Sequence, residues 1–335
     1  MSQAITIGVL GAAAIARRLM IPAIASLPES FVLSGVASRD AGRRSSVSAT
    51  FGCATYESYD SLLDDASIQA VYVPLPTSLH RQYVTMALGR GKHVLVEKSL
   101  GCSLQEVEEM TSAAEMRHLV LLENFQFRCH SQLATILKVL REGVIGELRS
   151  VRVAFGFPPF ADATNIRYQA ALGGGALFDV GAYALKIAPY FLGDRLFVAH
   201  AAMAFNTDKG VDTWGGGVLQ QEGGALQCQF SYGFDHHYQC ALELWGSKGK
   251  LRAGRIFTAP AAFTPVLEIE TAAAKQDRVL PPDDHFKNML QYFGRLVRGE
   301  EPASVEYLGN RTQAALVEGV RHRAGISRSS GSFNE

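Results

Sequence analysis

The chain has 335 residues, 47% of them hydrophobic, and its 32 basic and 32 acidic side chains leave no formal net charge. This balance excludes a global basic field that would attract nucleic acid or an anionic membrane. The length is enough for two domains of roughly 100–200 residues each.

The five cysteines are dispersed and odd in number, which indicates buried thiols in a reducing compartment rather than disulfides. Neither the cysteines nor the histidines show metal-ligand spacing, so no metal site is expected. The N-terminus lacks the basic region of a signal peptide, and no uncharged apolar run reaches roughly 18 residues. We therefore expect no membrane span and a cytoplasmic location.

In the first third of the chain, short apolar runs alternate with amphipathic stretches. This alternation predicts a parallel sheet covered by helices on both faces, because its unbroken apolar strands fit burial on both sides. Strands are predicted at residues 4–10, 31–37, 70–73, 93–96 and 119–122, and helices at residues 13–27, 83–89 and 103–116, with a polar helix after the second strand.

After a predicted helix at residues 131–141, apolar residues alternate with polar or small ones, which is typical of an antiparallel sheet. The clearest strand patterns lie at residues 151–155, 226–232, 241–245 and 250–251, followed by predicted helices at residues 285–297 and 308–324.

The first strand runs into a turn at Gly11 that can bring backbone N–H groups, and the positive end of a helix, close to a dinucleotide pyrophosphate. The fingerprint is imperfect, because Gly8 and Gly11 are spaced GxxG and Ala14 stands where a third glycine is usual. The alternative is an ordinary strand–turn–helix connection with small residues for close packing. On the dinucleotide interpretation, Gly11, Ala13, Ala14 and Ile15 contact the cofactor.

The end of the second strand favours NADP(H) over NAD(H). An NAD enzyme usually has an acidic residue there for the ribose, whereas this chain has Ser38 and Arg39, with Arg43 and Arg44 close behind. A hydroxyl and a guanidinium suit a 2′-phosphate. NAD(H) remains the alternative cofactor, and a solvated arginine face is the alternative structural explanation.

Two further patterns carry candidate chemistry. Glu97 and Lys98 follow a predicted parallel strand, at the edge where open α/β sheets bind ligands, although a surface ion pair would look the same. Asp179 and Tyr183 are four residues apart after a glycine triplet, so they share one helix face. A carboxylate beside a phenol can hold a sugar hydroxyl and donate a proton; the alternative is a helix-terminal Asp and a packed Tyr.

Together, these motifs resemble the Gfo/Idh/MocA oxidoreductases, and within them the nucleotide-sugar (dTDP-sugar) C-3 ketoreductases of deoxysugar biosynthesis. The resemblance runs from residue 4 to about residue 325. It rests on the order of the Gly11 turn, Ser38-Arg39, the stretch 72–76 with His80, Glu97-Lys98, the stretch 123–128 and the GGGALxDxGxY pattern at 173–183, with support from residues 146–150, 165–168 and 249–258.

The resemblance implies an α/β Rossmann domain with a parallel sheet at residues 1–123. It also implies a substrate-binding and oligomerisation α+β domain with a large open, mostly antiparallel sheet at residues 124–325. Residues 326–335 are expected to be a disordered tail. The implied activity is NADP(H)-dependent reduction of the C-3 ketone of a nucleotide-linked keto-deoxysugar.

By the same resemblance, Tyr183 is the proton donor and Lys98 holds the substrate and tunes Tyr183, so these two form the catalytic pair. The other site residues implied are Asp179, Arg128 and Tyr168 for the substrate, and Leu75, His80, Glu97, Lys98 and Arg167 for the cofactor.

One departure from the family pattern concerns the residue after Lys98. The family usually has Glu-Lys-Pro, and Ser99 in place of proline predicts a less rigid Lys98. Two alternative functions stay open: dehydrogenation of a free sugar, polyol or dihydrodiol, and a non-catalytic dinucleotide or sugar sensor. One uncovered face of the second sheet predicts a homodimer or homotetramer.

Overall fold

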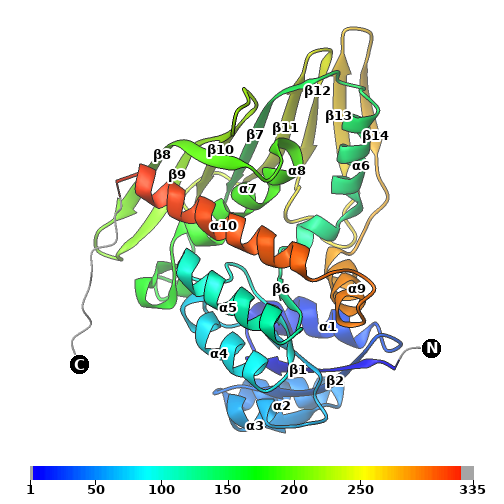
Figure 1. Ribbon diagram of the computed structural model, residues 1–335, viewed down its shortest axis with the longest axis vertical. Coiled ribbons are helices and arrows are strands. Elements are labelled where there is room, and N and C mark those ends of the chain that lie inside the picture. The colour runs from blue at the N-terminus through cyan, green and yellow to red at the C-terminus, as the bar shows by residue number, and fades with distance from the viewer. Residues whose placement is uncertain (1–2, 326–335) are drawn as a thin grey trace.

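A computed structural model describes residues 3–325 and shows two sheets connected by helices (Figure 1). The first sheet has six parallel strands in the order β3-β2-β1-β4-β5-β6, the doubly wound arrangement predicted from the alternating apolar runs. Its strands are β1 (Ile5–Leu10), β2 (Phe31–Ala37), β3 (Ala54–Tyr56), β4 (Ala70–Val73), β5 (His93–Val96) and β6 (Leu121–Glu123).

Helices cover both faces of this sheet, so the strands β1, β4, β5 and β6 are almost wholly buried. One face packs against Met20 and Ile24, and the other against Leu88 and Met110. The helices are η1 (Ala16–Met20), α1 (Ile21–Ala25), α2 (Ala41–Phe51), α3 (Tyr59–Leu63), α4 (Thr77–Gly89) and α5 (Leu104–Met116).

The second sheet has eight strands in the order β14-β13-β12-β11-β7-β10-β9-β8. All neighbours are antiparallel except β10 and β7, which run parallel, so the sheet is mixed and mostly antiparallel. Its strands are β7 (Leu148–Gly156), β8 (Leu196–Asn206), β9 (Val211–Gln221), β10 (Gln227–Gly233), β11 (Gln239–Gly246), β12 (Gly249–Gly254), β13 (Val266–Thr271) and β14 (Lys275–Val279).

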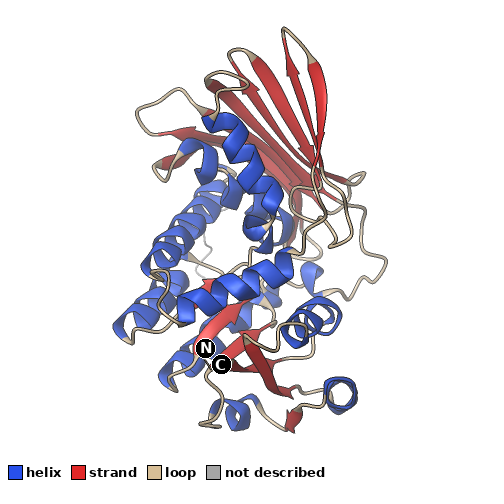
Figure 2. Cartoon of the chain, turned by 90° about the vertical axis from the view of Figure 1, so that its right-hand side faces the viewer, coloured by secondary structure: helices blue, strands red, loops and turns tan. Residues whose placement is uncertain are grey.

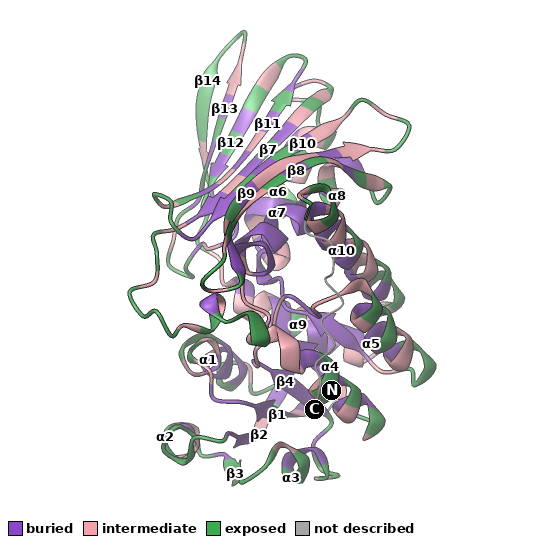
Figure 3. Ribbon diagram, turned by 90° about the vertical axis from the view of Figure 1, so that its left-hand side faces the viewer, coloured by how far each residue is buried: buried purple, intermediate pink, exposed green. Residues whose placement is uncertain are grey.

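Helices cover only one face of this second sheet, as Figures 1 and 2 show from two sides. The covered face supplies the largest apolar core. Along the strands, these buried residues alternate with residues of the opposite face, which are exposed or half-buried (Figure 3). The helices of this part are η2 (Gln126–Cys129), α6 (Ser131–Arg141), η3 (Ile166–Tyr168), η4 (Ala170–Leu172), η5 (Leu177–Gly181), α7 (Ala182–Ile187), α8 (Pro189–Leu192), α9 (His285–Val297) and α10 (Ser304–Arg323).

The two C-terminal helices return to the parallel sheet. Phe293 of α9 stacks on Phe31 at a ring-centroid distance of 6.5 Å, and Tyr307 of α10 packs among the residues of α5. Further along α10, Val317 and Val320 join the core of the second sheet. The division of the chain at residue 123 therefore stays a prediction about domains, and the proposed tail lies outside the described residues.

One helical run, Ala170–Leu192, is long and apolar enough to cross a membrane by length and composition alone. In the protein, 61% of its most apolar window is buried, and the run contains Asp179 and Lys186. Since the run lies in the core of the second sheet, the fold accounts for its apolar character.

Strand prediction succeeded where apolar runs were unbroken and also where apolar and polar residues alternated clearly, as in β7, β10, β11 and β12. The predicted strands at residues 31–37, 70–73 and 93–96 match β2, β4 and β5. Five strands were not predicted because their sequences lack a strand pattern: β3 is mostly exposed, β8 is rich in alanine, β9 contains three consecutive glycines, and β13 and β14 carry charged residues. Helix α4 begins six residues before its predicted start.

Candidate active site

The turn after β1 leaves a helix N-terminus accessible to a ligand. Gly11 has a φ of +122°, and a Cβ atom there would lie 3.0 Å from Cδ2 of Leu75. The helical residues that follow carry no acidic side chain in their first turn, and Ala14 is exposed. Since backbone N–H groups at such a terminus bind phosphate, Gly11, Ala13, Ala14 and Ile15 fit a dinucleotide pyrophosphate.

At the end of β2, one arginine is available for a further phosphate. Ser38 is buried, and its Oγ accepts a hydrogen bond from the Asp40 N–H at 3.2 Å. Arg43 pairs with Asp40 at 3.0 Å, although both side chains are about half exposed, so the pair is weak. Arg39 is exposed near the Tyr59 hydroxyl, and no carboxylate among residues 3–325 lies within ion-pairing distance of it.

Three strand ends meet around Glu97. Its Oε1 accepts hydrogen bonds from the Tyr72 hydroxyl on β4 at 2.6 Å and from Asn124 after β6 at 2.7 Å. Burial raises the pKa of the Glu97 carboxyl, and these hydrogen bonds act in the opposite direction. The residue predicted to contact the cofactor is thus anchored at the carboxyl edge of the parallel sheet.

Lys98 and Arg167 converge on one carboxylate. Lys98 Nζ lies 2.5 Å from Oδ1 of Asp179 and 2.9 Å from its backbone oxygen, and Arg167 Nε lies 2.5 Å from Oδ2. Burial alone would raise the pKa of Asp179, but the charges of Lys98 and Arg167 outweigh it and lower the pKa to about 2. The ionised Asp179 therefore holds both cations, which the sequence could not show.

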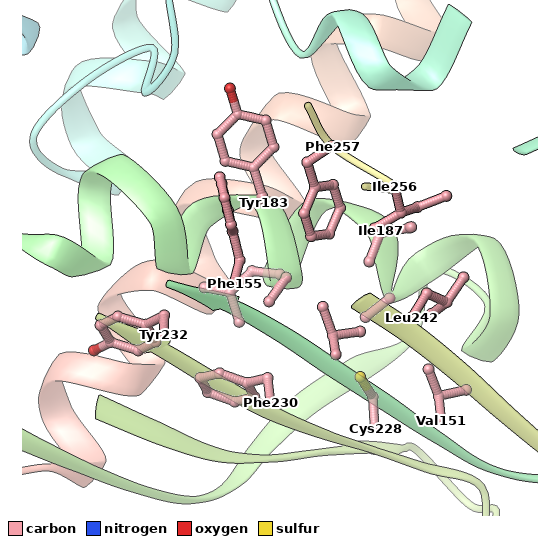
Figure 4. Close-up of a cluster of buried hydrophobic side chains, with 14 of the residues drawn as sticks. Val151, Phe155, Tyr183, Ile187, Cys228, Phe230, Tyr232, Leu242, Ile256 and Phe257 are labelled. Atoms are coloured by element: carbon pink, nitrogen blue, oxygen red, sulfur yellow. The ribbon is translucent and has the colours of Figure 1, made fainter. Parts of the chain in front are cut away.

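Tyr183 lies beside this cluster, with its ring centroid 5.3 Å from Lys98 Nζ. Phe125, Phe155 and Phe257 surround the ring at centroid distances of 5.2–5.3 Å, and the hydroxyl points away from the strands (Figure 4). Burial, and then the negative charges of Glu97 and Asp179, raise the pKa of Tyr183 well above its ordinary range. The phenol of Tyr183 therefore stays protonated at neutral pH, and its tuning by Lys98 stays a prediction.

The loop after Lys98 is held without the usual proline. The Lys98–Ser99 peptide bond is cis. The Ser99 hydroxyl donates to the Phe178 carbonyl oxygen at 3.1 Å, directly before Asp179. Lys98 itself makes two hydrogen bonds to Asp179, and the lower rigidity expected from Ser99 stays a prediction.

His80 is enclosed between the loops that carry Ser99 and Leu75. It has no exposed surface, and its ring nitrogens lie 2.9 Å from the Ser99 carbonyl oxygen and 2.8 Å from that of Leu75. Both ring nitrogens therefore have partners within the protein, and the contact of His80 with the cofactor stays a prediction. His80 supports the two loops from behind.

Arg128 is also placed away from the predicted substrate residues. Its guanidinium makes two contacts with Glu306 of α10, at 2.9 and 3.0 Å, and its side chain is 11% exposed. Glu306 is fixed further by the Tyr292 hydroxyl at 2.7 Å. Two of its nitrogens engage Glu306 and its buried Nε has no hydrogen-bond partner among the described residues, so Arg128 contributes to the junction of η2, α9 and α10, and its contact with substrate stays a prediction.

Tyr168 is nearly buried on the other side of Arg167. Its hydroxyl accepts a hydrogen bond from the Phe160 N–H at 3.1 Å. The Lys209 ammonium lies 3.6 Å from its ring centroid, and the Arg167 guanidinium lies over the ring of Phe160 at 4.8 Å. Tyr168 therefore belongs to an aromatic wall next to the Lys98–Asp179–Arg167 cluster, and its contact with substrate stays a prediction.

The sequence reasoning missed three residues that support the catalytic pair. Gln126 hydrogen-bonds the Tyr183 phenol. Glu123 accepts the Leu100 N–H at 2.8 Å and pairs with Lys186, one turn after Tyr183, at 3.1 Å. Gln126 and Glu123 lie in or beside the quoted stretch 123–128, but only the folded chain shows which of its side chains turn toward the site.

Comparison with known families agrees with this geometry. Residues 5–125 match the profile of an oxidoreductase family with an NAD-binding Rossmann fold, GFO_IDH_MocA, and residues 133–252 match a GFO/IDH/MocA C-terminal domain.

Individual relatives extend over nearly the whole chain. A dTDP-3,4-didehydro-2,6-dideoxy-alpha-D-glucose 3-reductase from Saccharopolyspora spinosa is 39% identical over 96% of this chain and 97% of its own. A D-xylose 1-dehydrogenase (NADP(+)) from Haloferax volcanii is 35% identical over 88% of this chain and 90% of its own. The crystal structure of KijD10, a 3-ketoreductase from Actinomadura kijaniata in complex with NADP and TDP-benzene, superposes with a TM-score of 0.91 at 37% identity, covering 95% of this chain and 97% of the other.

Proposed function

The chain belongs to the GFO/IDH/MocA oxidoreductase family, and from this premise we propose that it reduces the C-3 ketone of a nucleotide-linked keto-deoxysugar with NADPH. The class, an NAD(P)-dependent oxidoreductase of the sugar ketoreductase type, follows from the relatives along the whole chain. The substrate, the choice of NADPH and the roles of single residues are the parts proposed here.

The described residues fit such a cofactor. Gly11 leaves space that a Cβ atom would fill, the helix after it begins with small residues, and Arg39 is an unpaired cation at the end of β2. These groups would hold the pyrophosphate and the 2′-phosphate. When bound, the reduced nicotinamide supplies a hydride to the carbonyl carbon.

The arrangement of Lys98, Asp179 and Tyr183 is the observation that carries the proposal. Tyr183 is protonated across the neutral range, so it can donate its proton to the oxygen that becomes the new hydroxyl. Lys98, 5.3 Å from the ring, stabilises negative charge on the same oxygen. Asp179 orients Lys98 and Arg167 and has lone pairs left to accept substrate hydroxyls.

The phenol sets the expected pH behaviour of the reduction. Because the pKa of Tyr183 is raised, this residue stays protonated at every pH below about 9. Over that range, we expect no decrease in kcat/KM that is caused by its deprotonation. A sensor protein would need no such proton donor.

The first test is steady-state NADPH oxidation with a dTDP-linked 3-keto-6-deoxysugar, comparing the wild type with Tyr183→Phe. We expect the variant to lose about 10²- to 10⁴-fold in kcat and to bind NADPH as the wild type does, because only the proton donor is removed. The matched control is Tyr232→Phe, which removes a buried hydroxyl without a hydrogen-bond partner and should leave kcat unchanged.

Two results would contradict this proposal. Turnover of free sugars with NADP⁺, and none with nucleotide-linked keto-sugars, would place the chain with dehydrogenases such as the D-xylose relative. Tight NADPH binding without turnover of any sugar would indicate a sensor.

We also propose that the uncovered face of the second sheet forms a homodimer or homotetramer interface. A row of small residues crosses this face over five neighbouring strands, and with longer side chains beside it the row lines a hollow. Charged pairs such as Arg152–Glu243 and Arg252–Glu268 lie in the next row. A sheet face that helices leave uncovered over this extent suits packing against a second copy. The small residues are Ala202, Gly216, Ser231, Ala154 and Ala241.

A further inference from the structure

Arg255 has an unusual backbone at the exit of β12. Its φ is +47°, and only one other non-glycine residue among residues 3–325, His118, has a positive φ. The Gln132 side chain fixes this turn by donating to the carbonyl oxygens of Arg255 and Ile256, at 3.4 Å each. Non-glycine residues in this region of φ are uncommon and often occur at ligand-binding sites.

The Arg255 side chain is held in place by aromatic rings and not by a carboxylate. Its guanidinium carbon lies 5.1 Å from the ring centroid of Tyr238 and 5.7 Å from that of Phe263. The Tyr238 ring is itself fixed by a 2.8 Å hydrogen bond to the Thr258 hydroxyl. Arg255 is exposed, and no carboxylate among the described residues lies within ion-pairing distance of it. Its N–H donors are therefore oriented and free.

This turn is part of the wall around Tyr183. Phe257, two residues after Arg255, lies against Tyr183 with ring centroids 5.3 Å apart (Figure 4). The Phe257 N–H donates to Cys240 Sγ at 3.3 Å, which ties the turn to β11. Arg255 and Phe257 therefore belong to one short segment, in which Phe257 contacts the proposed proton donor and Arg255 lies two residues away from it.

The other cations near Tyr183 already have partners. Lys98 and Arg167 share Asp179, Lys186 pairs with Glu123, and Arg128 pairs with Glu306. A nucleoside diphosphate sugar brings two further negative charges that need free donors. A guanidinium held by aromatic rings is suited to bidentate binding of phosphate oxygens.

We propose that Arg255, oriented by Tyr238 and Phe263, binds the diphosphate of a nucleotide-linked sugar substrate. This inference rests on the proposed function and identifies the feature that separates a nucleotide-linked substrate from a free sugar. With the diphosphate at Arg255, the sugar extends along Phe257 toward Tyr183 and Lys98.

The test measures binding of dTDP and of thymidine by calorimetry for the wild type, Arg255→Ala and Arg255→Lys. We expect Arg255→Ala to weaken dTDP binding about 10- to 100-fold and Arg255→Lys to recover part of it, because lysine restores the charge but not the paired donors. Thymidine, which has no phosphate, should bind all three proteins equally. NADPH affinity should not change.

The matched control is Arg252→Ala, three residues earlier on β12, whose side chain pairs with Glu268 on the outer face of the sheet. It should bind dTDP as the wild type does. In turnover, Arg255→Ala should raise KM for the dTDP-sugar by the same factor as the binding loss. Wild-type-like dTDP affinity in both Arg255 variants would overturn the inference, as would an equal loss of thymidine binding.

The two proposals can fail separately. A wild type that turns over dTDP-sugars while Arg255→Ala keeps the same KM retains the proposed function and rejects the role of Arg255. A wild type without turnover whose dTDP binding depends on Arg255 rejects the reductase and keeps the diphosphate site.

Discussion

At the scale of residues, the electrostatics of the site depend on Asp179. It is the single carboxylate between Lys98 and Arg167, and its side chain is 14% exposed. Lys98 alone could adopt many rotamers, whereas the two contacts with Asp179 leave it one position beside Tyr183. The carboxylate thereby converts two flexible cations into a preorganised charge cluster, which is the form in which charges stabilise a developing oxyanion.

The low pKa of Asp179 predicts a dependence of stability on acid. Since the folded-state pKa, about 2, lies below the unfolded value of 3.8, the stabilisation is complete above the unfolded pKa and is lost as the pH falls toward 2. The shift corresponds to about 2 kcal/mol of unfolding free energy. Urea unfolding of the wild type and of Asp179→Asn at about pH 6, 4 and 3, which span the titration of carboxyl groups, measures the part of the unfolding free energy that depends on Asp179.

We expect Asp179→Asn to be less stable at pH 6 and to lose less stability on acidification than the wild type. The matched control is Asp277→Asn, an exposed position on β14, which should follow the wild-type curve. If Asp179→Asn and the wild type lost stability equally on acidification, the proposed stabilisation by an ionised Asp179 between Lys98 and Arg167 would be contradicted.

At the scale of elements, the turn between β1 and the following helix depends on its first residue. Gly11 donates its N–H to the Ala37 carbonyl oxygen at 2.8 Å, which joins the ends of β1 and β2, while its φ of +122° turns the chain into the helix. Leu75, after β4, closes the other side of the turn. The ends of β1, β2 and β4 thus meet at Gly11, whose backbone conformation and surroundings favour a residue without a Cβ atom.

Gly11→Ala is expected to lower the unfolding free energy by about 1–3 kcal/mol and to weaken NADPH binding, because the new Cβ is strained at this φ and crowds Leu75. Chemical denaturation and NADPH fluorescence titration measure the two effects. Adding Leu75→Ala removes the crowding but not the strain, so it should recover only part of the loss.

Gly89→Ala is the control for the glycine turn, because Gly89 lies in α4 with free space around it. It should be neutral or slightly stabilising in a helix. Unaltered NADPH affinity in Gly11→Ala would show that the cofactor does not use this turn.

At the scale of the whole molecule, α10 connects the two sheets. Its first turn holds Glu306, which binds Arg128 and Tyr292, and its last turns pack on β8. Lys186 of α7 reaches both Glu123 at the end of β6 and Asn310 of α10, each at 3.1 Å. Burial lowers the pKa of Lys186, and Glu123 opposes this. Buried contacts of this kind relate the helix of Tyr183 to the sheet edge of Lys98.

The uncovered sheet face gives a prediction for the assembly. Ala154→Arg places a long charged side chain in the row of small residues, and in a two-fold interface each substitution acts on both copies. We expect the wild type to sediment as a dimer or tetramer and the variant to dissociate into smaller species at the same concentration, with its fold intact by circular dichroism.

The control for the assembly is Glu108→Arg, which introduces the same side chain at an exposed position of α5 and should leave the oligomer intact. A wild type that sediments as a monomer, or an Ala154→Arg variant that assembles unchanged, would contradict the proposed interface.

The sequence alone was enough for the class of fold and for the proximity of Lys98, Asp179 and Tyr183, whose catalytic roles stay predictions. Unbroken apolar runs identified β2, β4 and β5, because burial on both faces demands such runs. The i, i+4 spacing placed Asp179 and Tyr183 on one side, and both do adjoin Lys98. Local pattern and chain order carry this information without reference to distant contacts.

Only the tertiary structure decided which partner each charged group has. Arg128 and His80 are candidate site residues in the sequence, and only the folded chain shows that Glu306, 178 residues away from Arg128, and two carbonyl oxygens around His80 are their partners. Likewise, the raised pKa of Tyr183 and the free guanidinium of Arg255 follow from which carboxylates lie near and which do not. Electrostatic interactions depend on distance and burial, and both arise from contacts between segments far apart in the chain.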